Sequence, residues 1–263
     1  MQLKPLFRYV GGKARLIRNS YPTRPTNIKS YCEPFFGGGA MFCDLVNRGS
    51  LDADYTALIN DLDTNLVNIY KFIKENSLET ISTTIISLGI SGPPTKKKYI
   101  KLLKKYNTSD RHPLIFLYLL RNSFSGMFRY NKDSTITMGI GHVLKTQWDF
   151  KQLEGWHKAL QHCEITNETY RNIDYSNYEF IYCDPPYVDS TYNYQNQGVP
   201  NKSNEIVSEI INYFSKEFQG TVWLSNKYSG IEDYSGYQIN KINNYYNLGR
   251  RECETVTEIL LIN

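Results

Sequence analysis

The sequence predicts an α/β fold, in which an open, Rossmann-like sheet is interrupted by a mainly helical insert that carries a β-hairpin. Two observations predict this class. Near the N-terminus, β-rich and helix-periodic segments alternate as strand, helix, strand, helix. The same alternation returns after residue 165, whereas helical patterns dominate between. A sheet of this kind binds its ligands at the carboxyl ends of its strands.

Local signals justify the elements of the first half. We expect helices over residues 14–18, 40–46 and 63–76, and strands over residues 30–33 and 56–60. A Gly11-Gly12 pair precedes the first helix, and Pro34 ends the first strand. Three glycines at 37–39 form the turn into the second helix, and Asp63 or Thr64 caps the third.

The insert and the second half follow in order. In the insert we expect helices over residues 96–106 and 113–122, and a hairpin over residues 128–141 with its turn at residues 131–134. After the insert we expect a helix over residues 204–218 and strands over residues 179–183, 221–225 and 258–262. The strand at 179–183 must stop at Asp184, because the two prolines that follow have no N–H for a ladder. The prediction is a discontinuous domain of residues 1–65 and 166–263, and a second domain of residues 66–165.

Composition excludes several classes of protein. The chain has 263 residues, with 30 Lys and Arg against 26 Asp and Glu, for a net charge of +4. This charge is compatible with nucleic-acid binding but is too small to predict it alone. No run of about 18 apolar residues occurs, and the N-terminus lacks the apolar core of a signal peptide, so we expect a cytoplasmic protein. The 22 tyrosines are either stacking platforms or ordinary core and surface residues.

Cysteine and histidine do not predict a metal site. The five cysteines form no CxxC pair, which favours free buried thiols in a reducing compartment. Of the four histidines only His157 and His162 are close in sequence, and no Glu stands where a zinc site would need it. We therefore expect no metal.

The tetrapeptide Asp184-Pro185-Pro186-Tyr187 carries the strongest chemical signal. A rigid carboxylate and carbonyl can accept both hydrogens of an exocyclic amine while an aromatic ring stacks on the base that bears it. Holding both N–H bonds out of plane makes the delocalised lone pair of adenine available for attack. The alternative is a strand-ending turn with a solvated Asp.

A second signal is the segment from Glu33 to Gly39, where glycines follow the first strand and precede a helix. The spacing is not GxGxxG, and Phe35, two residues before Gly37, suits the sulfonium and amino-acid part of S-adenosylmethionine. Asp61, after the second strand, is placed to accept hydrogen bonds from ribose hydroxyls. The alternatives are an ordinary tight turn and a helix N-cap.

These motifs resemble the DNA adenine-N6 methyltransferases of the Dam type, the D12 class in its α arrangement. The resemblance covers almost the whole chain. Its motifs are Phe7–Lys13, Phe35-x-Gly37-x-Gly39, Asp61, Gly126–Asn131, the Asp184 tetrapeptide, Leu224–Asn226 and Thr257–Asn263. It implies that the sheet is that of an S-adenosylmethionine-dependent methyltransferase and that the insert is a DNA-recognition domain.

The resemblance also assigns roles to residues. It implies that Asp184 and the Pro185 carbonyl hold the target amine, Pro186 helps to fix them, and Tyr187 stacks on a flipped adenine. It places the cofactor S-adenosylmethionine, and its product S-adenosylhomocysteine, on Tyr9, Lys13, Phe35, Gly37, Gly39, Asp61 and Tyr170. Lys13 is expected at the cofactor carboxylate and Asp61 at its ribose. Tyr170 is expected near the cofactor adenine, although a core tyrosine is the alternative.

For DNA, the resemblance points to the hairpin. Phe124, Ser125, Met127 and Asn131 match positions at the target bases. Arg129 is expected to pair bidentately with a guanine, and its alternative is a surface ion pair. A GATC target is the expectation, but the family's Pro-x-Gly step and following basic residue are replaced by the run from Gly139 to Val143.

A lysine-rich helix is predicted to contribute affinity for DNA that does not depend on base sequence. Six lysines lie within residues 96–105, and on a helix residues 97, 101, 104 and 105 share one side. Lys97 and Lys101 are expected to track phosphates. A solvated charged face is the alternative.

The partner expected is double-stranded DNA, bound by a monomer or weak dimer, in the bacterial cytoplasm or that of a host if the protein is viral. Other acceptors are adenine in RNA and N4 of cytosine. A different class of function is a non-catalytic DNA-binding module with a methyltransferase fold.

Overall fold

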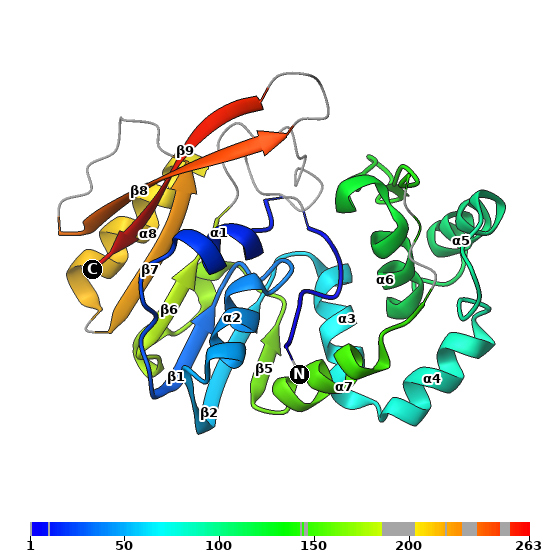
Figure 1. Cartoon of the computed structure of the whole chain (residues 1–263), viewed down its shortest axis with the longest axis horizontal. Helices are drawn as coiled ribbons and strands as arrows, with labels where there is room; N and C mark the ends of the chain where they lie inside the picture. The colour runs from blue at the N-terminus through cyan, green and yellow to red at the C-terminus, as the bar shows by residue number, and fades with distance from the viewer. Residues whose placement is uncertain are drawn as a thin grey trace.

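A computed structural model describes residues 2–9, 11–142, 144, 147–185, 203–218, 220–227, 236–247 and 253–263. The predicted α/β class is confirmed. Seven strands form one sheet in the order β5-β2-β1-β6-β7-β9-β8, and β9 alone runs antiparallel to the others (Figure 1). The strands are β1 (Ile28–Glu33), β2 (Leu51–Asn60), β5 (Cys163–Thr166), β6 (Phe180–Cys183), β7 (Thr221–Lys227), β8 (Gln238–Asn247) and β9 (Cys253–Ile262).

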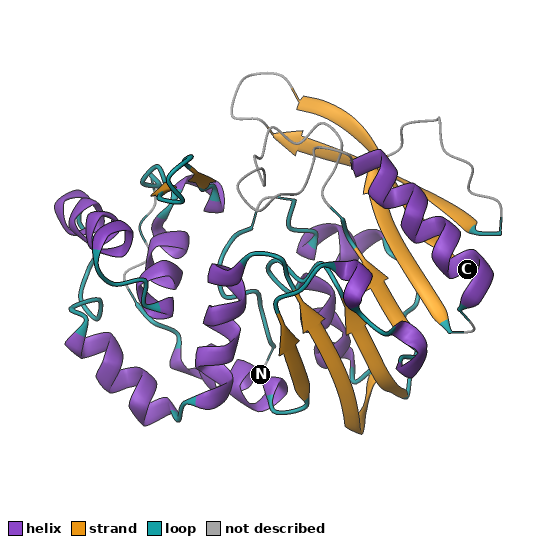
Figure 2. Cartoon of the chain, turned by 180° about the vertical axis from the view of Figure 1, so that it is seen from behind, coloured by secondary structure: helices purple, strands orange, loops and turns teal. Residues whose placement is uncertain are grey.

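Both faces of the sheet are buried, as its apolar strands require. Tyr31 and Cys32 of β1 point into different core clusters, and so do Tyr182 and Cys183 of β6. One cluster contains residues of α1 (Ala14–Ser20) and α2 (Ala40–Arg48), and the other contains residues of α8 (Ser203–Glu217). Figure 2 shows α8 in front of the sheet when the molecule is seen from behind.

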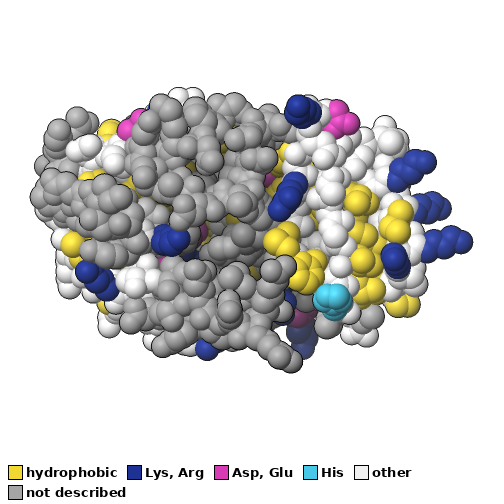
Figure 3. Space-filling view, turned by 90° about the horizontal axis from the view of Figure 1, so that it is seen from above, with side chains coloured by type: hydrophobic (Ala, Val, Ile, Leu, Met, Phe, Trp, Pro, Cys, Tyr) yellow, Lys and Arg dark blue, Asp and Glu magenta, His cyan; other side chains and the backbone are white. Residues whose placement is uncertain are grey.

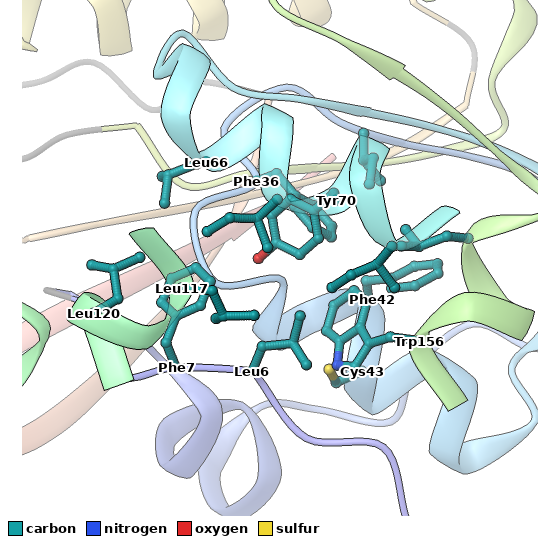
Figure 4. Packing of buried hydrophobic residues seen from close by; sticks show 14 of the residues in the cluster. Leu6, Phe7, Phe36, Phe42, Cys43, Leu66, Tyr70, Leu117, Leu120 and Trp156 are labelled. Carbon is teal, nitrogen blue, oxygen red and sulfur yellow. The ribbon is translucent and has the colours of Figure 1, made fainter. Parts of the chain in front are cut away.

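The helical part lies beside this sheet and shares its core. It contains α4 (Leu78–Ser87), α5 (Lys96–Thr108), α6 (Pro113–Asn122) and the hairpin β3 (Arg129–Tyr130) and β4 (Ile136–Thr137). Helices α3 (Thr64–Glu75) and α7 (Phe150–Leu160) pack between it and the sheet. Figure 4 shows Leu117 and Leu120 of α6 near Phe7, in the same cluster as Phe36 and Tyr70. A continuous core of this kind resists relative movement of its parts.

Every element that the sequence predicted is present, with ends shifted by a few residues. Asp63 caps α3, because its side chain accepts from the N–H groups of Asn65 and Leu66. Four further elements, α4, α7, β5 and β8, were not predicted. The expected domain boundary at residue 166 cuts through β5, which pairs with β2 in the main sheet.

Three further findings concern the thiols, the metal-ligand side chains and the helices of the described residues. Cys32, Cys43, Cys163 and Cys183 are buried free thiols. Among the described residues, no group of three or more His, Cys, Asp or Glu side chains is arranged to hold a metal ion. In the same part of the chain, every helix is too short or too polar to cross a bilayer.

Candidate active site at the carboxyl edge of the sheet

The loops after β1, β2 and β6 meet at the carboxyl edge of the sheet. The order of strands changes direction at β1, with β2 on one side and β6 on the other. Such a switch point is where open α/β sheets bind ligands. The loop after β1 is tied to the end of β2, because the N–H of Phe36 donates to the carbonyl of Asn60 at 2.8 Å. This edge therefore brings together Phe35, Asp61 and Asp184.

Lys13, immediately before α1, ends in a buried polar cluster with Asp184. Its Nζ atom lies 2.9 Å from Asp184 Oδ1 and 3.2 Å from Glu258 Oε2, and it donates to Ser225 Oγ at 2.8 Å. The side chains of Lys13 and Glu258 are 2% and 1% exposed, whereas that of Asp184 is 23% exposed. Asp184 is thus the member of this cluster that reaches solvent.

The cluster sets the ionisation of Asp184. Burial raises the pKa of Asp184 to about 6, the ammonium of Lys13 opposes this shift, and the charge of Glu258 adds to it. Burial lowers the pKa of Lys13, but Asp184, Tyr21 and Glu258 outweigh it and hold that pKa above its usual value. Lys13 therefore stays charged beside Asp184. The sequence placed Lys13 at the cofactor carboxylate; the structure places it on the proposed catalytic carboxylate.

Asp61 is fixed at both of its oxygens. Oδ2 accepts from the N–H of Gly37 at 2.7 Å, and Oδ1 accepts from the N–H of Asp63 at 2.9 Å. Burial raises the pKa of Asp61 to about 7, and the nearby charge of Asp63 adds to the shift. A carboxylate has about four acceptor positions, and these two N–H groups occupy two of them. Because Asp61 is partly exposed, its remaining positions can accept hydrogen bonds from the hydroxyl groups of a ligand.

Two of the glycines after β1, Gly37 and Gly39, have left-handed backbone conformations and leave no room for a side chain. Gly37 has φ +49, and a Cβ on it would lie 2.8 Å from the ring of Tyr9. Gly39 has φ +66, and its Cβ would lie within 3 Å of Phe36 and Trp156. Tyr9 therefore lies against the glycine turn, whereas Gly39 faces the core.

Phe35 and Tyr170 form an aromatic pair beside this turn. Their ring centroids are 5.3 Å apart at an interplanar angle of 41°. Tyr170 begins the short 3₁₀ segment Tyr170–Asn172 that follows β5, and its hydroxyl donates to Glu209. The structure thus brings together two predicted cofactor residues from distant parts of the chain.

The predicted tetrapeptide is described in part. Asp184 and the buried Pro185 directly follow β6. Pro186 and Tyr187 lie outside the described residues.

The predicted base-reading residues gather at a tight turn, Phe124–Gly126, and at β3. Ser125 and Gly126 both have positive φ, and a Cβ on Gly126 would lie 1.9 Å from the carbonyl oxygen of Arg8. The turn is therefore pressed against the N-terminal motif. Phe124 and Met127 are 44% and 37% exposed, so both side chains are accessible to a ligand. Figure 3 shows exposed hydrophobic and basic side chains on the described part of the upper face.

The remaining predicted DNA contacts differ in their availability. Arg129, Lys97 and Lys101 are exposed. The side chain of Asn131 instead closes the hairpin turn, since its Nδ2 donates to Thr135 Oγ1 and its Oδ1 accepts from Thr137 Oγ1. On α5, Lys105 pairs with Asp110 at 2.8 Å rather than joining the exposed lysines.

Sequence reasoning missed residues that hold the site together. Asn60 donates to the carbonyls of Pro34 and Glu168 and accepts from Thr166, so it joins the ends of three strands and loops. Ser225 and Glu258 were recognised only as parts of strands. Their signal was a polar residue inside an apolar strand, which when buried requires a partner.

Comparisons with known proteins identify the family of this chain. The family described as D12 class N6 adenine-specific DNA methyltransferase matches residues 9–259. A Type II methyltransferase, M.MjaIII, of Methanocaldococcus jannaschii is 26% identical over 206 residues, 71% of this chain and 70% of that protein. A DNA adenine methylase of Vibrio cholerae is 26% identical over 85% of this chain and 81% of its own length.

Solved structures are more distant. The rRNA methyltransferase aviRa of Streptomyces viridochromogenes aligns over 96% of this chain and 83% of its own, with 8% identity and a TM-score of 0.37. That similarity is too low to describe the site. The family match spans nearly the whole chain, and the chain belongs to the D12 class of N6 adenine-specific DNA methyltransferases.

Proposed function

We propose that this chain transfers a methyl group from S-adenosylmethionine to N6 of an adenine that is rotated out of duplex DNA. The observation that supports this most is the position of Asp184. It follows the central strand β6, is held by Lys13, and lies on the same edge of the sheet as Asp61 and Gly37.

In this proposal Asp184 and Pro185 bind the amine. Oδ1 of Asp184 is engaged by Lys13, so Oδ2 accepts one N–H and the carbonyl of Pro185 accepts the other. A pKa of about 6 keeps Asp184 mainly ionised at neutral pH. An ionised carboxylate fixed in advance stabilises the positive charge that develops on N6 as it attacks.

The residues around Asp61 fit an adenosyl cofactor. The anchored carboxylate suits the two hydroxyls of a ribose, and Tyr170, whose ring packs against that of Phe35, suits an adenine ring. Tyr9, against Gly37, borders the same turn. The cofactor supplies an electrophilic methyl group on a positively charged sulfur, and the protein supplies alignment and a fixed electrostatic environment.

The helical part is proposed to recognise DNA. Exposed Phe124, Met127 and Arg129 would face the target bases, and exposed lysines of α5 would face phosphates. Because β5 belongs to the main sheet, we propose that the recognition domain ends before residue 163. A guanine near the target adenine, as in GATC, is the partner proposed for Arg129.

A methyl-transfer assay tests the proposal. Duplex DNA, single-stranded DNA and RNA are incubated with S-adenosylmethionine carrying a labelled methyl group, and the nucleosides are identified by mass spectrometry. N6-methyladenine in duplex DNA is expected, with a loss of about 100-fold or more for Asp184→Ala. Methylation of cytosine, methylation confined to RNA, or full activity of Asp184→Ala would contradict it. Sequencing of the methylated bases reports the target site.

A further inference from the structure

The hydroxyl of Tyr130 joins the base-reading hairpin to the start of α3. It lies 2.8 and 2.7 Å from the two carboxylate oxygens of Asp63, and Asn65 Nδ2 donates to it at 2.6 Å. Asp63 is buried. A hydrogen bond to a buried charged group is among the stronger ones in proteins, so the hairpin and α3 are firmly connected here.

Asp63 passes this constraint to Asp61. The side chain of Asp63 caps α3, and its own N–H donates to Asp61 Oδ1 at 2.9 Å. The other oxygen of Asp61 accepts from Gly37. A displacement of Asp63 therefore moves one of the two groups that orient Asp61.

The base-reading turn has a second connection to the same place. Gly126 is in close contact with the carbonyl of Arg8, and the neighbouring Tyr9 lies against Gly37. Successive contacts therefore connect the recognition segment to the cofactor turn and back again. The residues along this path are Gly126, Arg8, Tyr9, Gly37, Asp61, Asp63 and Tyr130, and the hairpin strand joins Tyr130 to Gly126. Recognition segment and cofactor turn are thus linked at two points.

Strand β3 carries one side chain that faces solvent and one that bonds Asp63. Arg129 and Tyr130 are neighbours in β3, so their side chains point to opposite sides. Arg129 is exposed, and Tyr130 points inward to Asp63. Asn107 of α5 bonds both the N–H and the carbonyl of Ile136, the partner of Tyr130 in β4. Asn107 thus anchors the end of the hairpin that holds Tyr130. A restraint on the exposed side chain of Arg129 would therefore act on Tyr130, its neighbour in the strand.

We propose that Tyr130 is a positioning residue that couples target recognition to cofactor binding. Seating of the hairpin on a cognate site restrains Tyr130, and its existing hydrogen bonds to Asp63 pass that restraint to Asp61, the residue proposed to bind the ribose. This inference rests on the proposed function. Because coupling is reciprocal, cognate DNA should tighten cofactor binding by the factor by which cofactor tightens DNA binding.

The test compares Tyr130→Phe with a matched control, Tyr99→Phe. Tyr130→Phe keeps the ring and removes only the hydroxyl. Tyr99 on α5 has a buried hydroxyl without a hydrogen-bond partner among the residues that the structure describes, so its loss breaks no such contact. A second variant, Asp63→Ser, removes the carboxylate that faces Tyr130 but keeps a good N-cap residue.

The dissociation constant of S-adenosylmethionine is measured alone, with a duplex carrying the site methylated by the wild type, and with a duplex in which one base pair of that site is changed. For wild type and Tyr99→Phe, we expect the cognate duplex to tighten cofactor binding by about 5-fold or more. For Tyr130→Phe, we expect that ratio to fall to within about 2-fold of one, while the constant measured without DNA stays near the wild-type value. Asp63→Ser also removes a charge beside Asp61, so its constant without DNA is expected to change, and its ratio, again within about 2-fold of one, is the quantity that reports the coupling.

Three outcomes overturn the inference. These are a wild type with no tightening, a Tyr130→Phe variant that keeps the full ratio, and a variant that weakens cofactor binding equally with and without DNA. Failure of the proposed function would look different. The wild type would then bind no S-adenosylmethionine or would methylate no DNA, and the coupling would fall with it.

Discussion

Nζ of Lys13 lies 2.9 Å from Oδ1 of Asp184, within a cluster that also contains Glu258. The contact joins the N-terminal motif to the residue proposed to bind the target amine. Asp184 must be ionised for its charge to stabilise the positive charge that develops on that amine. Since its pKa is raised to about 6, kcat/KM on duplex DNA should increase through about pH 6 and level off above it. A pH profile that is flat between 5 and 8 would contradict this role.

Replacing Lys13 with Met should move that profile to higher pH. The ammonium of Lys13 lowers the pKa of Asp184, so its removal raises this pKa further. It also leaves Asp184 and Glu258 without their shared cation, which should lower the free energy of unfolding at neutral pH by about 3–5 kcal/mol. The loss should be smaller in acid, where Asp184 is protonated. Urea unfolding and kcat/KM across the pH range measure both effects.

Glu258→Gln should move the profile in the opposite direction. The charge of Glu258 raises the pKa of Asp184, so a neutral amide of similar shape should lower it and extend activity to more acidic pH. Tyr21 and Tyr182, two further titratable groups beside this cluster, stay neutral because burial raises the pKa of both. An unchanged acid limb in Glu258→Gln would show that Glu258 does not act on Asp184.

The sequence predicted the sheet better than its edges. Strand β6 is an uninterrupted apolar run that ends at Asp184 and Pro185, and β7 contains the apolar run Val222–Leu224, so both are recognised from their own pattern. By contrast, β5 has four residues, two of them polar, and β8 includes the polar run Asn243-Asn244. Such strands are specified by the partners they pair with rather than by their own pattern.

The site residues likewise fall into those that local sequence identifies and those that depend on the tertiary fold. Asp61, Gly37 and Asp184 stand next to strand ends and glycines, so local sequence identifies them. The bonds of Tyr130 to Asp63, 67 positions away, and of Lys13 to Ser225, 212 positions away, depend on how the chain folds back on itself. The hydrogen bonds of Asn131 are local instead, because its side chain bonds Thr135 and Thr137 within the hairpin, and its predicted contact with DNA stays a prediction.

Gly126→Ala tests the close approach of the base-reading turn to the N-terminal motif. Gly126 has φ +71, a region that costs other residues about 1–2 kcal/mol. Its new Cβ would also meet the Arg8 carbonyl at 1.9 Å, so the two segments must separate. We expect the free energy of unfolding to fall by more than about 2 kcal/mol and cofactor binding to weaken. Gly92→Ala, where a Cβ meets nothing within 4 Å, should change neither.

The double variant Lys97→Ala/Lys101→Ala tests the role of α5 in binding phosphates. Both side chains are exposed, whereas Lys105 pairs with Asp110 and Lys98 donates to the carbonyl of Gly92. If each lysine neutralises one phosphate, the slope of log K against log salt concentration should become shallower by about 2 for duplexes of any sequence. Base preference should be unchanged, because phosphate contacts carry no sequence information.

Lys151→Ala, at an exposed lysine on α7, is the control and should leave the slope as it is. An unchanged slope in the double variant would show that the lysines of α5 form a solvated face, and the phosphate contacts would then have to be sought elsewhere in the recognition domain.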